Sequence, residues 1–164
     1  MATNLKNLSE FDPSSLPSSK NMRFAIIVSE WNKEITESLL KGAYDTLLKS
    51  GTSTGNILVE HVPGSFEIPY AAKLIAEKMK PDAVICLGCV IQGETRHFDF
   101  ICQAVTQGIT ELNLRFNIPF IFGILTTQNI EQARQRAGGK HGNKGVEAAI
   151  TAIKMAALKR KFPD

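Results

Sequence analysis

Short apolar runs alternate along the chain with segments in which apolar residues recur at the spacing of a helix. The runs lack helical periodicity, which is typical of buried strands. They predict four strands, at 24–29, 57–62, 83–91 and 120–125. The periodic segments predict helices. These helices run from a cap at Asn32 to residue 48, over 68–79 and 98–114, from a cap at Thr126 or Thr127 to Arg136, and over 144–160.

The repeated order of strand and helix determines the predicted fold class. A strand, a helix and a further strand form a parallel pair with a right-handed crossover. Strands that are apolar on both sides need helices on both faces of their sheet. We therefore predict an α/β fold, a three-layer α/β/α sandwich around a four-stranded parallel sheet. Ligands of such sheets bind where the carboxyl ends of the strands open into loops.

The chain has 164 residues, of which 43% are apolar, and this suits one domain with a true core. Residues 1–22 differ from the rest because serines and prolines separate isolated apolar residues. Such a segment cannot bury enough surface to offset its ordering entropy alone. We predict a flexible N-terminal arm at 1–22 and a single domain at 23–164.

Charge and composition exclude several classes of protein. The net charge is +3 and the basic residues are scattered, whereas nucleic-acid binding needs a clustered basic face. The longest apolar run, 83–91, has nine residues, and a membrane span needs about 20. No apolar stretch follows the first lysine, as a secretory signal would require. Three cysteines, an odd number, fit a reducing compartment, so we expect a cytoplasmic protein.

The cysteines and histidines predict neither a redox motif nor a metal site. Cys86 and Cys89 have CxxC spacing but lie in a predicted strand, where their side chains point to opposite faces about 10 Å apart. A disulfide needs alpha carbons within about 7 Å. The histidines, His61, His97 and His141, lack metal-ligand spacing, so no metal is expected.

The loops after the first two strands carry candidate ligand contacts. Trp31 follows the first strand and is either a packing residue or a flat face for a planar ligand. After the second strand, Gly64 lets a ligand approach the backbone, and Ser65 offers a free amide at a helix start. The same residues also suit an ordinary turn, with Glu67 in the first turn of a helix.

The loop after the third strand, 92–99, has features of an anion site and of an acid–base group. Residues 93–95 precede a helix, so their backbone N–H groups and the helix dipole can face an anion. His97 stands at this junction, with Asp99 two residues further on to orient it. An imidazole exchanges protons near neutral pH, although a histidine in such a loop can equally be solvated.

A glycine-rich segment, 138–145, carries two lysines and is either a phosphate cradle or a turn between two helices. It lacks the Walker spacing and a preceding strand. Arg136, just before it, can bind a phosphate through its guanidinium fork. The sequence has no GxGxxG motif, which argues against a dinucleotide site.

Three of these segments together resemble the lumazine synthase family. They are Val62-Pro-Gly-Ser-Phe-Glu-Ile-Pro69, Leu87-Gly-Cys-Val-Ile-Gln-Gly-Glu-Thr-Arg-His-Phe-Asp99, and the stretch from Phe122 to Gly145. The resemblance extends over about 23–157. It implies a flavodoxin-like domain that condenses 5-amino-6-(D-ribitylamino)uracil with 3,4-dihydroxy-2-butanone 4-phosphate. The product would be 6,7-dimethyl-8-ribityllumazine, formed with release of phosphate and water in the penultimate step of riboflavin biosynthesis, without a cofactor.

The same resemblance assigns roles to individual residues. It implies that His97 is the catalytic proton-transfer residue. The pyrimidine and ribityl contacts would be Trp31, Ser65, Phe66, Glu67, Cys89, Val90, Ile91, Phe122 and Lys144. The butanone phosphate contacts would be Glu94, Thr95 and Arg136. Glu94 and Gln92 depart from the family pattern, and the Glu94 carboxylate must turn away from the phosphate or pair with Arg96 or Arg136.

The resemblance also implies an assembly of identical subunits. Members form pentamers with active sites between adjacent subunits, and Phe122 and Arg136 would come from the neighbour. The short turn at 138–145 resembles that of members that form a 60-subunit icosahedral shell. The N-terminal arm would add a strand to the neighbour's sheet. Riboflavin synthase is a candidate partner.

Two other functions could use the same fold. One is a flavin or lumazine receptor that stacks its ligand on Trp31, and the other is a container without chemistry. His97, Asp99 and Arg136 together favour an enzyme, because neither a receptor nor a shell needs a proton relay.

Overall fold

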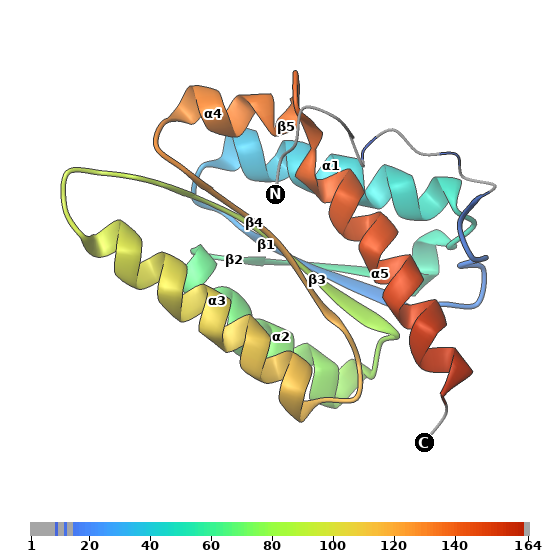
Figure 1. Cartoon of the computed structure of the whole chain (residues 1–164). Helices are drawn as coiled ribbons and strands as arrows, with labels where there is room; N and C mark the ends of the chain where they lie inside the picture. The colour runs from blue at the N-terminus through green and yellow to red at the C-terminus, as the bar shows by residue number, and fades with distance from the viewer. Residues whose placement is uncertain (1–8, 10–11, 13–14, 163–164) are drawn as a thin grey trace.

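Four parallel strands form the central sheet, in the order β2-β1-β3-β4 (Figure 1). They are β1 (Phe24–Ser29), β2 (Ile57–Val62), β3 (Ala83–Ile91) and β4 (Phe120–Thr127), and all three pairings are parallel, as predicted. The computed structural model describes residues 9, 12 and 15–162. The remaining parts of the predicted arm, 1–8, 10–11 and 13–14, lie outside the described residues.

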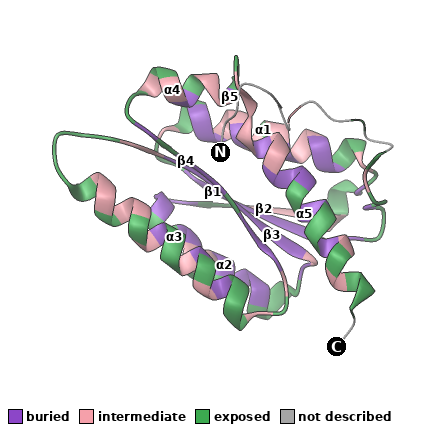
Figure 2. Cartoon of the chain, viewed as in Figure 1, coloured by how far each residue is buried: buried purple, intermediate pink, exposed green. Residues whose placement is uncertain are grey.

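Helices cover both faces of the sheet, so the chain forms the predicted three-layer α/β/α sandwich of flavodoxin-like strand order (Figure 1). One face is covered by α1 (Lys33–Lys49), α4 (Ile130–Gln135) and α5 (Lys144–Lys161). The other is covered by α2 (Ile68–Met79) and α3 (His97–Arg115). Each face has its own apolar core, and the strands are buried between the two helical layers (Figure 2).

Successive residues of a strand point to opposite cores, as the period of a strand requires. In β1, Ile26 faces α1 and α5, whereas Ile27 faces α2 and α3. In β3, Cys86 and Cys89 belong to opposite cores, and both thiols are free. The prediction that these two side chains point to opposite faces of the sheet is confirmed.

β4 runs two residues further than predicted, because Thr126 and Thr127 continue the pairing with β3. The Thr127 hydroxyl donates to the Asn129 carbonyl at 3.0 Å, and α4 begins only at Ile130. The cap of α4 is Asn129, whose side-chain oxygen accepts from the Gln132 amide at 2.9 Å. The predicted cap at Thr126 or Thr127 is therefore wrong, since a β-branched threonine suits the end of a strand as well as a helix cap.

The glycine-rich segment forms a small hairpin between α4 and α5. Its strands, β5 (Ala137–Gly139) and β6 (Gly142–Asn143), pair antiparallel. Gly138 and Gly142 have φ angles of 112° and 77°, in the left-handed region that favours glycine. This agrees with the interpretation as a turn between two helices and adds a pair of strands to it. Two short 3₁₀ helices, η2 (Thr54–Asn56) and η3 (Ser65–Glu67), are also additions to the predicted elements.

The last residues of the predicted arm contact the domain. Met22 is buried in the core beneath α1 and α5, and the Ser19 hydroxyl donates to the Ser50 carbonyl at 2.7 Å. The packed part of the chain therefore begins ahead of the predicted boundary at residue 23. Within the described residues, no helix combines the length and the apolarity needed to cross a membrane.

Candidate functional site

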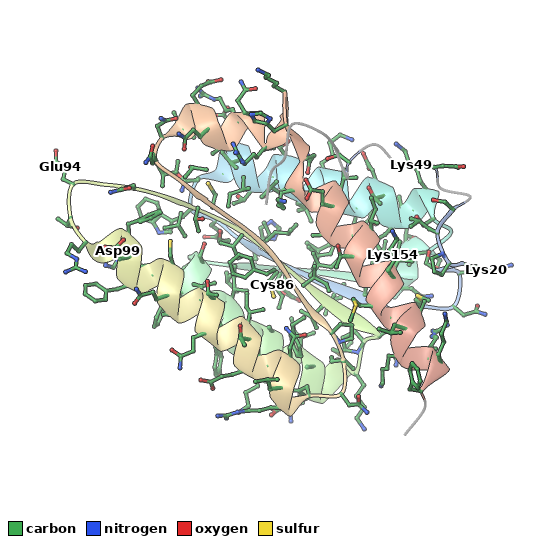
Figure 3. All side chains as sticks on the ribbon, in the orientation of Figure 1. Lys20, Lys49, Cys86, Glu94, Asp99 and Lys154 are labelled. Carbon is green, nitrogen blue, oxygen red and sulfur yellow. The ribbon has the colours of Figure 1, made fainter. Side chains whose placement is uncertain are left out.

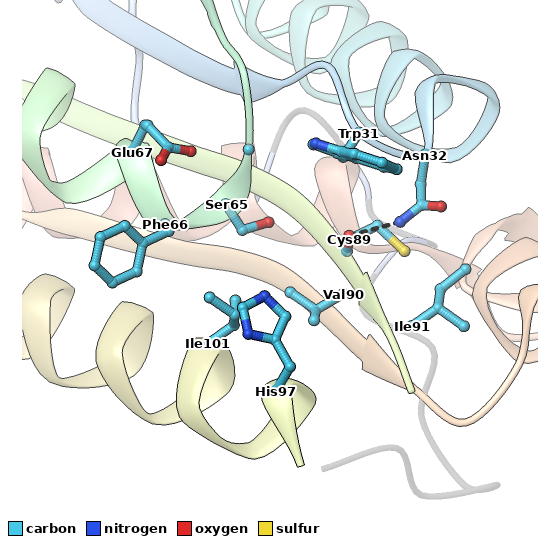
Figure 4. A pocket seen from close by; sticks show the side chains of 11 residues that line it. Trp31, Asn32, Ser65, Phe66, Glu67, Cys89, Val90, Ile91, His97 and Ile101 are labelled. Carbon is cyan, nitrogen blue, oxygen red and sulfur yellow. Dashed lines mark hydrogen bonds between the residues drawn. The ribbon is translucent and has the colours of Figure 1, made fainter. Parts of the chain in front are cut away.

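A pocket of about 810 Å³ opens at the carboxyl ends of β1, β2 and β3, beside the first turn of α3 (Figure 4). β1 and β3 are neighbours in the sheet although β2 lies between them in sequence, so the pocket lies where the strand order reverses. Parallel sheets bind ligands at such a position. The lining residues are Trp31, Asn32, Gly64, Ser65, Phe66, Glu67, Cys89, Val90, Ile91, His97 and Ile101.

Trp31 forms one wall of the pocket. Its side chain is 72% exposed, which rules out a packing role within the chain and leaves the flat face of the indole for a ligand. The Trp31 amide donates to the Pro63 carbonyl at 3.3 Å and so holds this wall beside the loop after β2. A Cβ added at Gly64 would lie 3.4 Å from the indole and 2.9 Å from a Glu67 carboxylate oxygen. Gly64 therefore keeps the space between Trp31 and Glu67 open.

The Ser65 side chain lines the pocket but has only 6% of its surface exposed (Figure 4). Among the described residues, its hydroxyl has no hydrogen-bond partner. A buried hydroxyl without a partner costs free energy that a hydrogen bond from a ligand would recover. Gly88 of β3 leaves room for this hydroxyl, because a Cβ there would lie 2.6 Å from Ser65 Oγ.

His97 is the first residue of α3, and its ring reaches into the pocket beside Ile101 (Figure 4). Asp99 does not orient this ring as predicted. Its carboxylate instead pairs with Arg96, with 3.5 Å between Oδ2 and Nε, because the two residues lie one helical turn apart. Within the described part of the chain, the His97 ring makes no hydrogen bond and is free to meet a ligand.

The loop between β3 and α3 presents backbone donors at the edge of the pocket. The amides of 93–95 have no acceptor among the described residues, and the positive end of the α3 dipole lies beside them. The Thr95 hydroxyl accepts from the His97 amide at 3.4 Å. Glu94 is exposed at the outer end of the loop and points away from the protein (Figure 3), which is one of the two orientations predicted for its carboxylate. The loop therefore retains the donors that an anion needs.

Besides Glu94 and Thr95, which belong to the loop at its edge and do not line it, three predicted contacts lie away from this pocket. Phe122 is exposed on the edge strand β4, and Arg136 follows α4, where its Nη1 donates to the Gln132 carbonyl at 3.5 Å. Both are predicted to act in a neighbouring subunit, so a single chain does not test them. Lys144 begins α5 on the opposite face of the sheet and pairs with Glu147, with 2.6 Å between Nζ and Oε2. A single chain therefore does not form the predicted pyrimidine contact of Lys144.

The structure adds Asn32 and Ile101 to the lining residues predicted from the sequence. Ile101 lies four residues after His97, and this spacing on one side of a helix could have revealed it. The sequence predicts Asn32 only as a helix cap, but its side chain makes no capping bond. Its Nδ2 donates instead to the Cys89 carbonyl at 2.9 Å. A contact between residues so far apart in the chain leaves no local signal.

The thiols and the acidic side chains do not form a reactive centre or a metal centre in the part of the chain that the structure describes. No three His, Cys, Asp or Glu residues gather there in a metal-binding arrangement. Burial raises the pKa of Cys86 to about 12 and that of Cys89 to about 11. Burial, with a smaller effect from Asp99, also raises the pKa of Cys102. These thiols therefore remain protonated near neutral pH, and the titratable side chains that line the pocket besides Cys89 are His97 and Glu67.

Fold and pocket define a flavodoxin-like protein with a ligand site at the carboxyl edge of its sheet. The family model of 6,7-dimethyl-8-ribityllumazine synthase matches residues 21–160. A protein of that name from Porphyromonas gingivalis is 59% identical over 160 residues, which cover 98% of this chain and 99% of its own length. Proteins of the same name from Cytophaga hutchinsonii and Parabacteroides distasonis are 61% and 59% identical. They cover 93% and 94% of this chain, and 95% and 97% of their own lengths.

The chain therefore belongs to the 6,7-dimethyl-8-ribityllumazine synthase family. The matched range contains every residue that lines the pocket. It also contains the predicted contacts that do not line the pocket of a single chain, which are Glu94, Thr95, Phe122, Arg136 and Lys144.

Proposed function

We propose that this protein is an enzyme, a transferase of riboflavin biosynthesis that forms 6,7-dimethyl-8-ribityllumazine. It condenses 5-amino-6-(D-ribitylamino)uracil with 3,4-dihydroxy-2-butanone 4-phosphate and releases phosphate and water. Membership of the family supports this reaction. The observation that carries it in the structure is the convergence of Trp31, Ser65 and His97, from three separate loops, on one pocket.

The uracil substrate fits between the loop after β1 and the end of β3. The indole of Trp31 stacks on the pyrimidine, and Cys89, Val90 and Ile91 contact its edge, largely through backbone groups. The ribityl chain is rich in hydroxyls and supplies a partner for Ser65 and for the Glu67 carboxylate, with Phe66 beside them.

The phosphate of the second substrate binds at the start of α3. The amides of 93–95 and the Thr95 hydroxyl donate to its oxygens, and the helix dipole favours its charge. Arg136 of a neighbouring subunit adds a guanidinium fork. Glu94 leaves this site undisturbed because it points outward.

The reaction begins when the 5-amino group of the uracil attacks the ketone carbon, and loss of water gives an imine. Elimination then releases phosphate, and closure of the second ring releases another water. His97 moves the protons of these steps, since an imidazole both accepts and donates near neutral pH. Alignment of the two substrates in one pocket supplies much of the rate enhancement, for which orientation can contribute roughly 7–11 kcal/mol.

The complete site forms between subunits of a homo-oligomer in the cytoplasm, a pentamer that further assembles into a 60-subunit shell. Large exposed apolar side chains support burial by another copy, because Phe66 in the pocket, Tyr70 on α2 and Phe100 on α3 are all exposed in the single chain. Phe122 and Arg136 come from the neighbouring subunit, and residues of 1–22 add a strand to its sheet. Riboflavin synthase, which would consume the product, is the proposed protein partner.

The direct test mixes the purified protein with both substrates and follows the fluorescence of the lumazine product. Replacement of His97 by Ala is expected to slow turnover about 10²-fold or more, because proton transfer is lost. Light scattering should give the same particle size for this variant. His61→Ala is the matched control, since His61 lies exposed on β2 and pairs with Glu37 outside the pocket.

If the wild-type protein forms no product, it is not this enzyme, and the two remaining functions are a receptor and a container. Unchanged turnover in the His97→Ala variant would remove His97 from the mechanism.

A further inference from the structure

Asn32 has a left-handed backbone conformation that helix capping does not explain. It precedes α1 with φ 58° and ψ 46°, in the left-handed region that few residues other than glycine adopt. A residue at this position normally caps the helix with its side chain. The Asn32 side chain makes no such bond and turns to the pocket instead (Figure 4).

The side-chain amide of Asn32 connects the loop after β1 to the end of β3, where the two strands are no longer paired. The pairing of β1 with β3 ends at Val28 and Leu87. Beyond that point the chain after β1 follows β2, because the amides of Glu30 and Trp31 donate to the Val62 and Pro63 carbonyls. The loop that carries Trp31 is therefore fixed to the β2 side by its backbone.

The hydrogen bond from Asn32 Nδ2 to the Cys89 carbonyl, 2.9 Å long, connects this loop to the end of β3. In the described residues, no other hydrogen bond joins residues 30–32 to 88–91. The two segments are the opposing walls between which the uracil is proposed to bind (Figure 4).

We propose that Asn32 is a positioning residue, whose amide sets the spacing between the Trp31 indole and the Cys89–Ile91 segment. The proposal rests on the function given above, because the spacing matters for a planar ring held between these walls. Asn32 acts through Trp31 and Cys89, and no contact of its own with the substrate is needed. Its left-handed backbone is the consequence, since it directs the side chain across to β3.

The test uses Asn32→Gly, which accepts the left-handed backbone without strain and removes the side chain that carries the amide. Asn32→Asp is the second variant, because aspartate also tolerates this backbone but places an acceptor against the Cys89 carbonyl. For both variants we expect KM for the uracil substrate to rise about tenfold, with kcat and KM for the butanone phosphate changed less than about threefold.

A second readout does not need activity. Trp31 is the sole tryptophan of the chain, so its fluorescence anisotropy decay reports the motion of this one ring. We expect a larger fast component in Asn32→Gly than in the wild type. In a Trp31→Ala background, Asn32→Gly should cause no further rise in KM, because the ring through which it acts is gone.

Asn113→Ala is the control for a loss of stability alone. Asn113 bonds the backbone of Phe120 at the opposite end of the sheet, so its loss should lower the melting temperature and leave KM unchanged. The proposal is overturned if Asn32→Gly and Asn32→Asp leave KM and the anisotropy as in the wild type, or if Asn113→Ala raises KM equally. A wild-type protein that forms no product would refute the proposed function, and the anisotropy would then decide the role of Asn32 by itself.

Discussion

The hydroxyl of Ser65 is kept available for a ligand by the absence of a side chain opposite it. Gly88 of β3 faces Ser65, and both lie beneath the pocket. An unpartnered buried hydroxyl costs about 1–3 kcal/mol. A ligand hydroxyl placed there recovers that cost on binding, which links the packing of β3 to substrate affinity.

Replacement of Gly88 by Ala should weaken both stability and binding. The new Cβ would lie 2.6 Å from Ser65 Oγ and within 3.2 Å of methyl carbons of Ile124 and Ile68. Overpacking of this kind costs about 1–3 kcal/mol. Chemical denaturation should show that loss, and KM for the uracil substrate should rise because Ser65 is displaced.

Two further variants separate the clash with Ser65 from the effect on stability that any Gly→Ala substitution has. Gly55→Ala is the matched control, since nothing lies within 4 Å of a Cβ at Gly55. In a Ser65→Ala background, Gly88→Ala should lower the free energy of unfolding by less, because Ser65 Oγ, the atom closest to the new Cβ, is gone. Equal costs of Gly88→Ala with and without Ser65 would show that the two residues are not coupled.

At the scale of residues, the sequence predicts which loops line the pocket better than it predicts the hydrogen bonds and ion pairs of their side chains. Trp31, Ser65 and His97 follow strand ends, and a parallel sheet brings strand ends together. The partner of Asp99 was wrongly predicted, because spacing alone does not choose between His97 and Arg96. The bond of Asn32 was missed because it depends on the order of the strands in the folded sheet.

At the scale of elements, α1 and α4 are joined by a two-bond ion pair. Arg134 donates from Nε and Nη2 to the two carboxylate oxygens of Glu34, at 2.8 and 3.0 Å. Glu34 lies in the first turn of α1, just after the Trp31 wall, and Arg134 lies in α4, just before Arg136. The pair thus links the pocket of one chain to the arginine proposed to act in the neighbouring chain's pocket.

This ion pair should make the link between α1 and α4 sensitive to acid. The hydrogen bond from Arg134 holds the pKa of the Glu34 carboxyl below its usual range. A carboxyl group with a lowered folded-state pKa stabilises the fold above its unfolded pKa, and this contribution is lost as the pH falls through the folded-state pKa. We expect Glu34→Gln to melt slightly below the wild type at pH 7 and the difference to shrink as the pH falls below the ordinary glutamate pKa of about 4.3.

Thermal melts from pH 7 to pH 3 would measure the effect, with Glu77→Gln as control. Glu77 pairs with Lys73 through a single exposed contact of 3.7 Å on α2. A Glu34→Gln curve that stays parallel to the wild type over the whole range would contradict the acid sensitivity, and a curve that coincides with the wild type would show that the pair contributes nothing.

The strands and long helices follow from the sequence because burial on both sides of a sheet leaves an unbroken apolar run. The boundary between β4 and α4 does not, since Thr126 and Thr127 are polar residues that a strand end also accepts. The hairpin of β5 and β6 was predicted only as a turn, because three and two residues are too few to show a strand period.

At the scale of the whole molecule, the single chain has a pocket at the edge of its sheet and several large exposed apolar side chains. Its pocket holds His97, while Arg136 lies outside it, after α4. Phe66 lines the pocket and Phe100 lies in the first turn of α3, and both are large exposed side chains. Association with a second copy would cover this surface and bring a guanidinium to the phosphate site. Hydrophobic periodicity and strand ends do not reveal which residues of another copy would meet this surface, and only the family resemblance implies Phe122 and Arg136.

Complementation between two inactive variants tests this account most directly. His97→Ala and Arg136→Ala are produced separately and together, and formation of the fluorescent lumazine is measured. If the two residues act on the same substrates from adjacent subunits, each variant alone is nearly inactive. Mixed oligomers then recover about a quarter of the wild-type activity, because random assembly leaves about that share of interfaces with both residues intact. Coexpressed protein that is no more active than the average of the two variants would contradict a site shared between subunits.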